Sequence, residues 1–448
     1  MIGQGNRLND TNQKSRWVIV REPIVQKVFI LVFTISLIAG LLRFLFPFQM
    51  LNLGGTESLI SVGSSLSSIG QILGLIILSR LLSSQRTALS VSGILVAIFA
   101  LVTAFSFSTN LLLISRIAEG AGTGLLAIII IRISSDLEES RGETVGTLLA
   151  GVFLGSALGQ GFSGLLVGQL AAIYAITQTE AIMLLGTILS AIYIPLQIVF
   201  VPITKGVDNY YITKADINHG HRHYRLILKQ LVSKNLLVLL GIYLLYDFSH
   251  GIYTPGLSIM INNNGIPLDQ IGLGYFIGDT VWGASQLFTG KLVDRIGSIA
   301  PLSLSLVAKG ILVLLYPYAA SFLVLTSLLA MAGLSEGFLE PARNDAAMEH
   351  TPGAQTIHSH KHYFLGHAPG NPFSLTRHDH EHAHRSGSDE IVSILQSLGI
   401  IGFACGSFGG GWLLFQGFTL MNLVLIGGVF LIIAGILPSG LGWSKRHQ

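Results

Sequence analysis

Ionisable side chains inside long apolar runs are the residues of this sequence most able to do chemistry. One run carries a polar and aromatic stripe formed by Tyr243, Tyr246, Asp247, His250 and Tyr253. Spacings of about three and four residues place these side chains on one face of a helix. A carboxylate there can carry a proton through a transport cycle, and an imidazole can relay one near neutral pH. His250 could equally be a core histidine with satisfied hydrogen bonds.

Other apolar runs also contain charged residues. An ionisable group in hydrocarbon is costly, so it usually faces a bundle interior or a water-filled cavity. Asp247 or Glu336 is our first choice for the proton-carrying carboxylate, followed by Glu119. A simpler interpretation of each charge is a structural ion pair, such as Asp279 with Lys309. The candidate residues of a substrate and proton pathway are Arg43, Arg116, Glu119, Tyr246, Asp247, His250, Asp279, Lys309 and Glu336.

Histidines alternate with other residues in a long polar connection, 348–388. Neutral imidazoles suit Zn, Ni, Cu and Co, so this segment is a candidate for metal buffering or sensing, although no cofactor is expected to be required. The alternative is an insert that binds metal only incidentally. His250 is the only histidine expected inside the membrane, which makes translocation of a free metal ion the weaker hypothesis. The candidate metal ligands are His358, His360, His362, His378, His380, His382 and His384.

Membrane-spanning helices are the elements that must position these residues. Half of the 448 residues are hydrophobic and 11% are charged, and the mean hydropathy is +0.65, whereas a soluble domain carries about a quarter charged residues. A span needs about 20 mostly apolar residues. We therefore predict an all-α membrane protein with twelve transmembrane helices. The predicted spans are Val25–Met50, Ser58–Leu82, Thr87–Phe107, Leu111–Ile133, Thr144–Leu170, Glu180–Val201, Asn235–Ile261, Leu268–Leu292, Ile299–Tyr318, Phe322–Ala347, Asp389–Leu414 and Thr419–Leu437. Pro255 and Gly256 should break or bend the seventh span.

The twelve spans divide into two sets of six. The predicted parts are an N-terminal tail (1–24), a six-helix bundle (25–203), a linker (204–234), a second bundle (235–439) and a C-terminal tail (440–448). Lys and Arg fall in alternate connections, which places both termini, the linker and the connection 348–388 in the cytoplasm. We expect a multi-pass protein of a bacterial inner membrane that works as a monomer.

Several classes of protein are disfavoured by the sequence. A single cysteine, Cys405, excludes a disulfide framework. The net charge of +3 gives no sign of a nucleic-acid partner. Since no P-loop or other catalytic constellation is present, an enzyme is not expected. The expected partners are a small-molecule substrate, protons and the lipid bilayer.

One connection carries a specific motif, Gly290-Lys-Leu-Val-Asp294-Arg295-Ile-Gly297. It resembles the G-x-L-x-D-R-x-G signature of the major facilitator superfamily. The resemblance implies two pseudo-symmetric six-helix bundles and a cytoplasmic gate that Asp294 and Arg295 latch. An ordinary capped turn is the simpler interpretation. The implied gate residues are Gly290, Asp294, Arg295, Gly297, Glu340 and Arg343. Glu340 and Arg343 could instead belong to the substrate path.

Two further motifs are partial. Arg116-Ile-Ala-Glu119-Gly-Ala-Gly122 is similar to the R-x-x-x-G-x-G motif of the fourth helix in this superfamily. A glycine ladder from Gly151 to Gly164 resembles the fifth-helix motif of its drug/proton-antiporter branch, although Ser156 replaces the expected proline and close packing alone would explain it. The resemblance implies a proton-coupled exporter that works by alternating access. The alternative is a transporter of a transition metal or a metal–chelator complex, with a metal-sensing histidine-rich loop.

Overall fold

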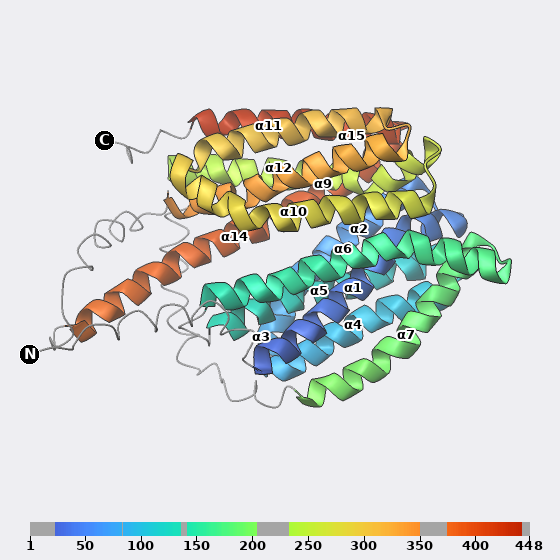
Figure 1. Ribbon diagram of the computed structural model, residues 1–448, viewed down its shortest axis with the longest axis horizontal. Helices are drawn as coiled ribbons and strands as arrows, with labels where there is room; N and C mark the ends of the chain where they lie inside the picture. Colours follow the sequence, from blue (N-terminus) through green and yellow to red (C-terminus); the bar gives the residue numbers. More distant parts are fainter. Residues whose placement is uncertain (1–22, 83, 136–140, 204–232, 350–373, 441–448) are drawn as a thin grey trace, which may run out of the picture.

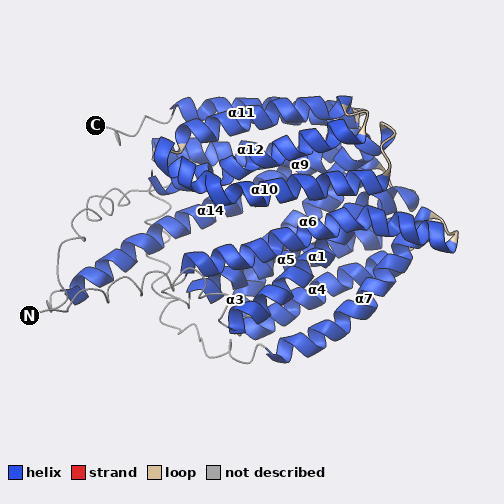
Figure 2. Cartoon of the chain, in the orientation of Figure 1, coloured by secondary structure: helices blue, strands red, loops and turns tan. Residues whose placement is uncertain are grey.

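The computed structural model describes residues 23–82, 84–135, 141–203, 233–349 and 374–440. Every regular element in these residues is helical, and they contain no strand (Figure 2). The first half contains α1 (Pro23–Asn52), α2 (Glu57–Ile72), a π-helical segment (Leu73–Leu78), α3 (Ser79–Leu81), α4 (Gln85–Phe105), α5 (Thr109–Ser135), α6 (Arg141–Tyr174) and α7 (Gln178–Ile203). The second half contains α9 (Lys234–Asn263), α10 (Leu268–Ile296), α11 (Ile299–Leu315), α12 (Phe322–Glu349), α14 (Ser374–Phe415) and α15 (Leu420–Ile436), with short 3₁₀ segments Tyr316–Tyr318 and Leu437–Gly440.

Twelve long helical passes follow one another in this order, six in each half, when α2, the π-helical segment and α3 are taken as one pass. Within the part of the chain that the structure describes, ten of them are long and apolar enough to cross a membrane. The other two are α15, which has 17 residues, and α10, whose composition is more polar. The predicted twelve-helix membrane fold is therefore confirmed. Six short connections join consecutive described helices at one end of the bundle, called here the short-loop end. They are residues 53–56, 106–108, 175–177, 264–267, 319–321 and 416–419.

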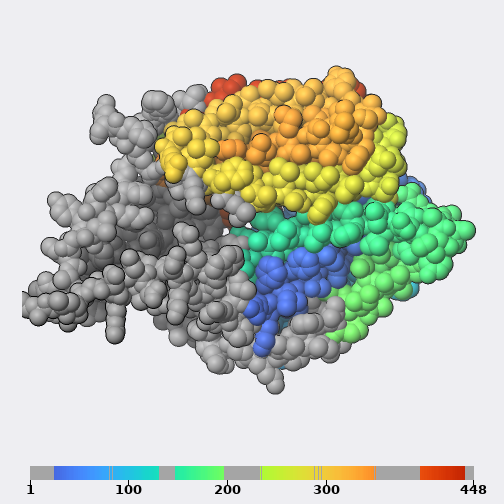
Figure 3. All heavy atoms as spheres, viewed as in Figure 1, coloured from blue at the N-terminus to red at the C-terminus, as the bar shows by residue number. Residues whose placement is uncertain are grey.

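The two halves pack against each other through equivalent helices. The fifth helix of the first half, α6, packs on the second helix of the second half, α10, and α14 packs in the same way on α2. Figure 1 shows α9 to α12 and α15 lying over α1 to α7, and Figure 3 shows the two halves meeting along a seam. Ser58 Oγ at the start of α2 donates to the Gly411 carbonyl near the end of α14 at 2.7 Å. The halves are thus in contact at the short-loop end.

Glycines let the fifth helix of each half approach the first helix closely. A Cβ atom added at Gly159 of α6 would meet the backbone of Leu37 and Leu41 in α1. A Cβ atom added at Gly406 of α14 would meet the backbone of Phe248 in α9. Small residues at such contacts allow backbones to approach, which favours helix association in a membrane. The glycine ladder of α6 therefore serves packing.

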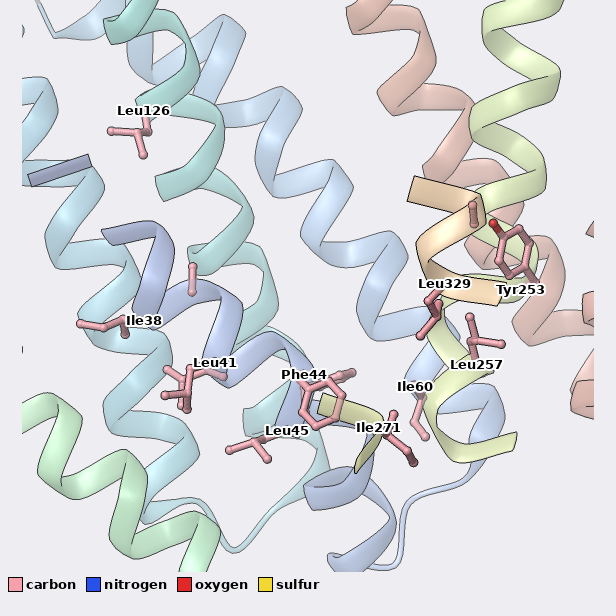
Figure 4. Packing of buried hydrophobic residues seen from close by; sticks show 14 of the residues in the cluster. Ile38, Leu41, Phe44, Leu45, Ile60, Leu126, Tyr253, Leu257, Ile271 and Leu329 are labelled. Atoms are coloured by element: carbon pink, nitrogen blue, oxygen red, sulfur yellow. The ribbon is translucent and has the colours of Figure 1, made fainter. Parts of the chain in front are cut away.

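Buried apolar side chains of both halves belong to one hydrophobic cluster. Ile38, Leu41 and Leu45 of α1 are buried in the first half, and Leu257 of α9 and Leu329 of α12 are buried in the second. Figure 4 shows these groups on separate sets of helices. The packing holds the helices that carry the charged residues in fixed positions.

Three local features of the structure were not predicted from the sequence. α9 continues without a break through Pro255, because a membrane helix can have the freed backbone groups satisfied by neighbours. The second span contains a π-helical segment at Leu73–Leu78, which an apolar pattern alone does not reveal. α14 begins at Ser374 and not at Asp389, so part of the predicted loop 348–388 is helical; polar residues extend this helix where no hydrocarbon limits its length.

Candidate functional site

A cavity of about 430 Å³ lies between the two halves. Helices of both halves contribute to it, chiefly α1, α2, α5 and α6 on one side and α9, α10, α12 and α14 on the other. Its wall combines charged, hydroxyl, amide and aromatic side chains, which suits a small polar molecule with an apolar part. Its polar and charged lining residues include Arg43, Arg116, Gln160, Asp247, Tyr275 and Arg343.

Arg43, Arg116 and Glu119 form one charged group, called here the N-terminal triad. Arg43 of α1 donates from Nε to Glu119 Oε1 at 3.1 Å, and its Nη2 contacts the same oxygen. Arg116 Nη1 lies 3.0 Å from Glu119 Oε2, and Ser67 Oγ donates to that oxygen at 2.5 Å. The Glu119 side chain is fully buried, whereas that of Arg43 is 40% exposed. One carboxylate thus holds two guanidinium groups beside the cavity.

Asp247, Glu340 and Arg343 form the corresponding C-terminal triad. Arg343 Nη2 donates to Glu340 Oε1 at 2.8 Å, while its Nη1 lies 3.6 Å from Asp247 Oδ2. The guanidinium group also lies over the Tyr243 ring, 4.2 Å from the centroid, a cation–π arrangement. Here one guanidinium group is shared by two carboxylates.

A third cluster surrounds Glu336 of α12 and is joined to the C-terminal triad by Tyr246. Lys309 of α11 forms an ion pair with Glu336, and Tyr246 Oη donates to Glu336 Oε2 at 2.8 Å. His250 Nε2 lies 3.5 Å from Glu336 Oε1, and Tyr253 Oη lies 3.2 Å from the same His250 nitrogen. The predicted stripe on α9 is therefore real, since three of its members meet one carboxylate or its partner.

Asp279 of α10 is the exception among these carboxylates. Gln160 Nε2 of α6 donates to Asp279 Oδ2 at 3.2 Å, so this bond joins the two halves. Among the described residues, no cation lies within ion-pair distance of Asp279. The expected pair with Lys309 is wrong, because Lys309 is engaged by Glu336.

The structure brings all nine predicted pathway residues to this region. Arg43, Arg116 and Asp247 line the cavity. Three of the other six contact a lining residue directly, and three contact Tyr246, whose ring lies beside Arg343. Those six are Glu119, Tyr246, His250, Asp279, Lys309 and Glu336.

The structure places the predicted gate residues in two regions, the cavity and the end of α10. Arg343 lines the cavity and Glu340 binds it, so the substrate-path interpretation describes their position better. Gly297 ends α10 with φ +84°, a backbone conformation that glycine adopts readily. Arg295 and Gly290 lie on the last turns of the same helix, and the side chain of Asp294 is outside the described part. The latch role of this loop stays a prediction.

The metal prediction falls outside the described side chains. His358, His360 and His362 belong to residues that the structure does not describe, and His378 to His384 lie in the first turns of α14 without described side chains. Within the described residues, no three His, Cys, Asp or Glu side chains gather in a way that could hold a metal ion.

Some site residues were not singled out from the sequence. Ser67, Gln71, Tyr275 and Gln396 line the cavity, and Ser67 binds Glu119. Glutamine inside an apolar span was the available signal for Gln71, because its amide must find partners within the bundle. Serine gives no such signal, since its hydroxyl can bond to its own helix.

Twelve helices in two packed halves around a polar, charged cavity define a multi-pass membrane transporter. The chain belongs to the major facilitator superfamily: the sequence model described as Major Facilitator Superfamily matches residues 28–357. Two solved structures of the nucleoside transporter NupG, one of them a mutant, are similar. The mutant is 13% identical with a TM-score of 0.65, and the other is 14% identical with a TM-score of 0.63. Each alignment covers 94% of this chain and 100% of that chain, and at such identity the likeness shows the fold alone. No curated protein sequence matches this chain.

Proposed function

We propose that this transporter is a proton-coupled exporter of a small molecule, in a bacterial inner membrane with both termini in the cytoplasm. The observation that carries the proton coupling is the surplus of one carboxylate around the cavity. The cations are Arg43, Arg116, Lys309 and Arg343, and the carboxylates are Glu119, Asp247, Asp279, Glu336 and Glu340. Among the described residues of this region, four positive and five negative charges leave a net charge of −1, which one proton neutralises.

Asp279 is the best candidate for that proton. The other four carboxylates each contact Arg or Lys, whereas Asp279 accepts a hydrogen bond from the neutral Gln160 amide. An unpaired charge away from bulk water is costly. Asp247 and Glu336, the carriers expected from the sequence, are occupied by Arg343 and Lys309.

The position of Asp279 links its proton to the movement of the two halves. Its bond from Gln160 spans α6 and α10, which form one of the two major contacts between the halves. Alternating access requires one half to rock against the other around the central site. Gain or loss of a proton at Asp279 would change an acceptor at this contact and bias the movement.

The export direction is supported only by the resemblance of the α6 glycine ladder to that of proton-linked exporters. The ladder also has a packing role against α1, so direction needs a direct test. A metallophore or metal cargo remains a second prediction that depends on histidines outside the described side chains.

The test is transport by the purified protein in lipid vesicles with an imposed pH gradient of either sign. A pH-sensitive dye inside the vesicles would report proton movement as candidate substrates are added, with metal chelates and lipophilic cations included in the screen. We expect substrate movement and proton movement in opposite directions. Substrate transport that ignores pH gradients of both signs would contradict proton coupling, and movement in the same direction would contradict export by antiport.

A further inference from the structure

The two triads occupy equivalent helices with opposite charge. The first helix of each half supplies one member, Arg43 on α1 and Asp247 on α9. The fourth helix supplies the other two at positions i and i+3, Arg116 and Glu119 on α5, and Glu340 and Arg343 on α12. The order of acid and base is reversed between these two pairs.

The charges of the triads differ in sign. Two arginines and one glutamate give the N-terminal triad a charge of +2 − 1 = +1. One arginine and two carboxylates give the C-terminal triad a charge of +1 − 2 = −1. Arg43 and Arg116 on one side and Asp247 and Arg343 on the other line the same cavity. The cavity therefore lies between a triad of net positive charge and a triad of net negative charge.

Both triads contain buried guanidinium groups. Arg116 is 3% exposed and Arg343 is 6% exposed. The Nε and Nη1 atoms of both residues have no hydrogen-bond acceptor among the described residues, although Nη1 contacts a carboxylate in each ion pair. A buried guanidinium donor without an acceptor is costly, so an additional acceptor beside Arg116 or Arg343 would be stabilising.

We infer that the substrate is a small zwitterion, a molecule with both a carboxylate and an ammonium group, an inference that rests on the proposed transport function. The carboxylate binds at Arg43 and Arg116, and the ammonium group binds at Asp247. An anion would compensate the positive charge of the N-terminal triad but not the negative charge of the C-terminal triad. A cation would compensate only the C-terminal triad. Phe44, Phe46 and Tyr275 also line the cavity and offer aromatic surface to the apolar part of the molecule.

The test measures binding to the purified protein in detergent, without any gradient, as a rise in thermal unfolding temperature with ligand concentration. The probes are matched by a common phenyl group: phenylalanine and phenylalanine-containing dipeptides as zwitterions, 3-phenylpropionate as the anion and phenethylamine as the cation. We expect at least one zwitterion to bind about tenfold or more tightly than either single-charge probe, the effect of about one ionic contact.

Two variants change the charge of one triad each. Arg43→Gln makes the N-terminal triad neutral, so the preference should move to phenethylamine. Asp247→Asn makes the C-terminal triad neutral, so the preference should move to 3-phenylpropionate. Arg43→Lys keeps the charge and should keep the preference for zwitterions, which separates a charge effect from a folding defect. The unfolding temperature without ligand checks that each variant is folded.

Equal binding of 3-phenylpropionate and the zwitterions would overturn the inference. So would a failure of all the zwitterions to bind, or variants that lose binding without changing preference. The outcome is separable from the proposed function. Zwitterion binding without pH-driven transport would contradict proton coupling alone, and proton-coupled transport of singly charged molecules only would contradict the zwitterion alone.

Discussion

At the scale of single residues, the contacts of Lys309 show why charges can be stable inside the bundle. Its side chain is 3% exposed, and it contacts Glu336 while donating to Tyr246 Oη at 3.4 Å. Its ammonium group also lies 5.0 Å from the centroid of the Tyr246 ring. Removing one partner of a buried ion pair leaves an uncompensated charge, whereas removing both can be nearly neutral. The pair therefore depends on both members.

The Lys309→Met variant should lose about 3–5 kcal/mol of stability, because Glu336 is then left without its cation. The double variant Lys309→Met, Glu336→Gln should recover a large part of that loss. Thermal unfolding of the detergent-purified variants measures both effects, and Glu336→Gln alone completes the cycle. Equal losses in the single Lys309→Met variant and the double variant would show that the pair is not the source of the stability.

At the scale of helices, the glycines of α6 and α14 decide how closely the helices pack. The ladder of α6 was recognised in the sequence because it resembles a family motif. The equivalent contact with α9 is made by a second ladder in α14, which includes Gly402, Gly406 and Gly410. This ladder resembles no family motif that was identified in the sequence. Spacing alone predicts a small-residue face, and only the fold shows which helix lies against it.

Gly159→Ala and Gly406→Ala should each destabilise the protein by about 1–3 kcal/mol, because the added Cβ atom meets the backbone of a neighbouring helix. Gly283→Ala in α10 is the matched control, since nothing lies within 4 Å of the Cβ atom added there. It should be neutral, or stabilising by up to about 1 kcal/mol through helix propensity. The yield of folded protein and the unfolding temperature would check this order. A Gly406→Ala variant as stable as the Gly283→Ala variant would contradict the packing argument.

At the scale of the whole molecule, hydropathy and the Gly290–Gly297 motif are sufficient to predict twelve helices in two halves. They also predict which charges meet at the centre, because ionisable residues in apolar helices avoid lipid. They do not predict the partners. Asp279 and Lys309 lie on helices α10 and α11, which are consecutive in the chain, yet Lys309 pairs with Glu336 and Asp279 binds Gln160 of the other half. Such pairings depend on helix rotation, which an apolar pattern leaves open.

Contacts between the halves at the short-loop end make a cross-link informative. A Cβ atom at Gly411 would lie 3.0 Å from the Ser58 carbonyl oxygen. The variant Ser58→Cys, Gly411→Cys, made with the native Cys405 replaced by serine, should therefore form a disulfide on mild oxidation. Transport should then stop and return on reduction, because alternating access separates the halves at this end. Each single-cysteine variant is the control. Full transport by the cross-linked protein would contradict the movement.

The most direct test of the proton-coupling claim is transport by the Asp279→Asn variant in lipid vesicles. Exchange of labelled for unlabelled substrate needs no net proton movement, so the variant should keep exchange while losing accumulation driven by a pH gradient. Asp269→Asn, at an exposed position in the first turn of the same helix, should keep both activities. Undiminished pH-driven accumulation by the Asp279→Asn variant would contradict the account.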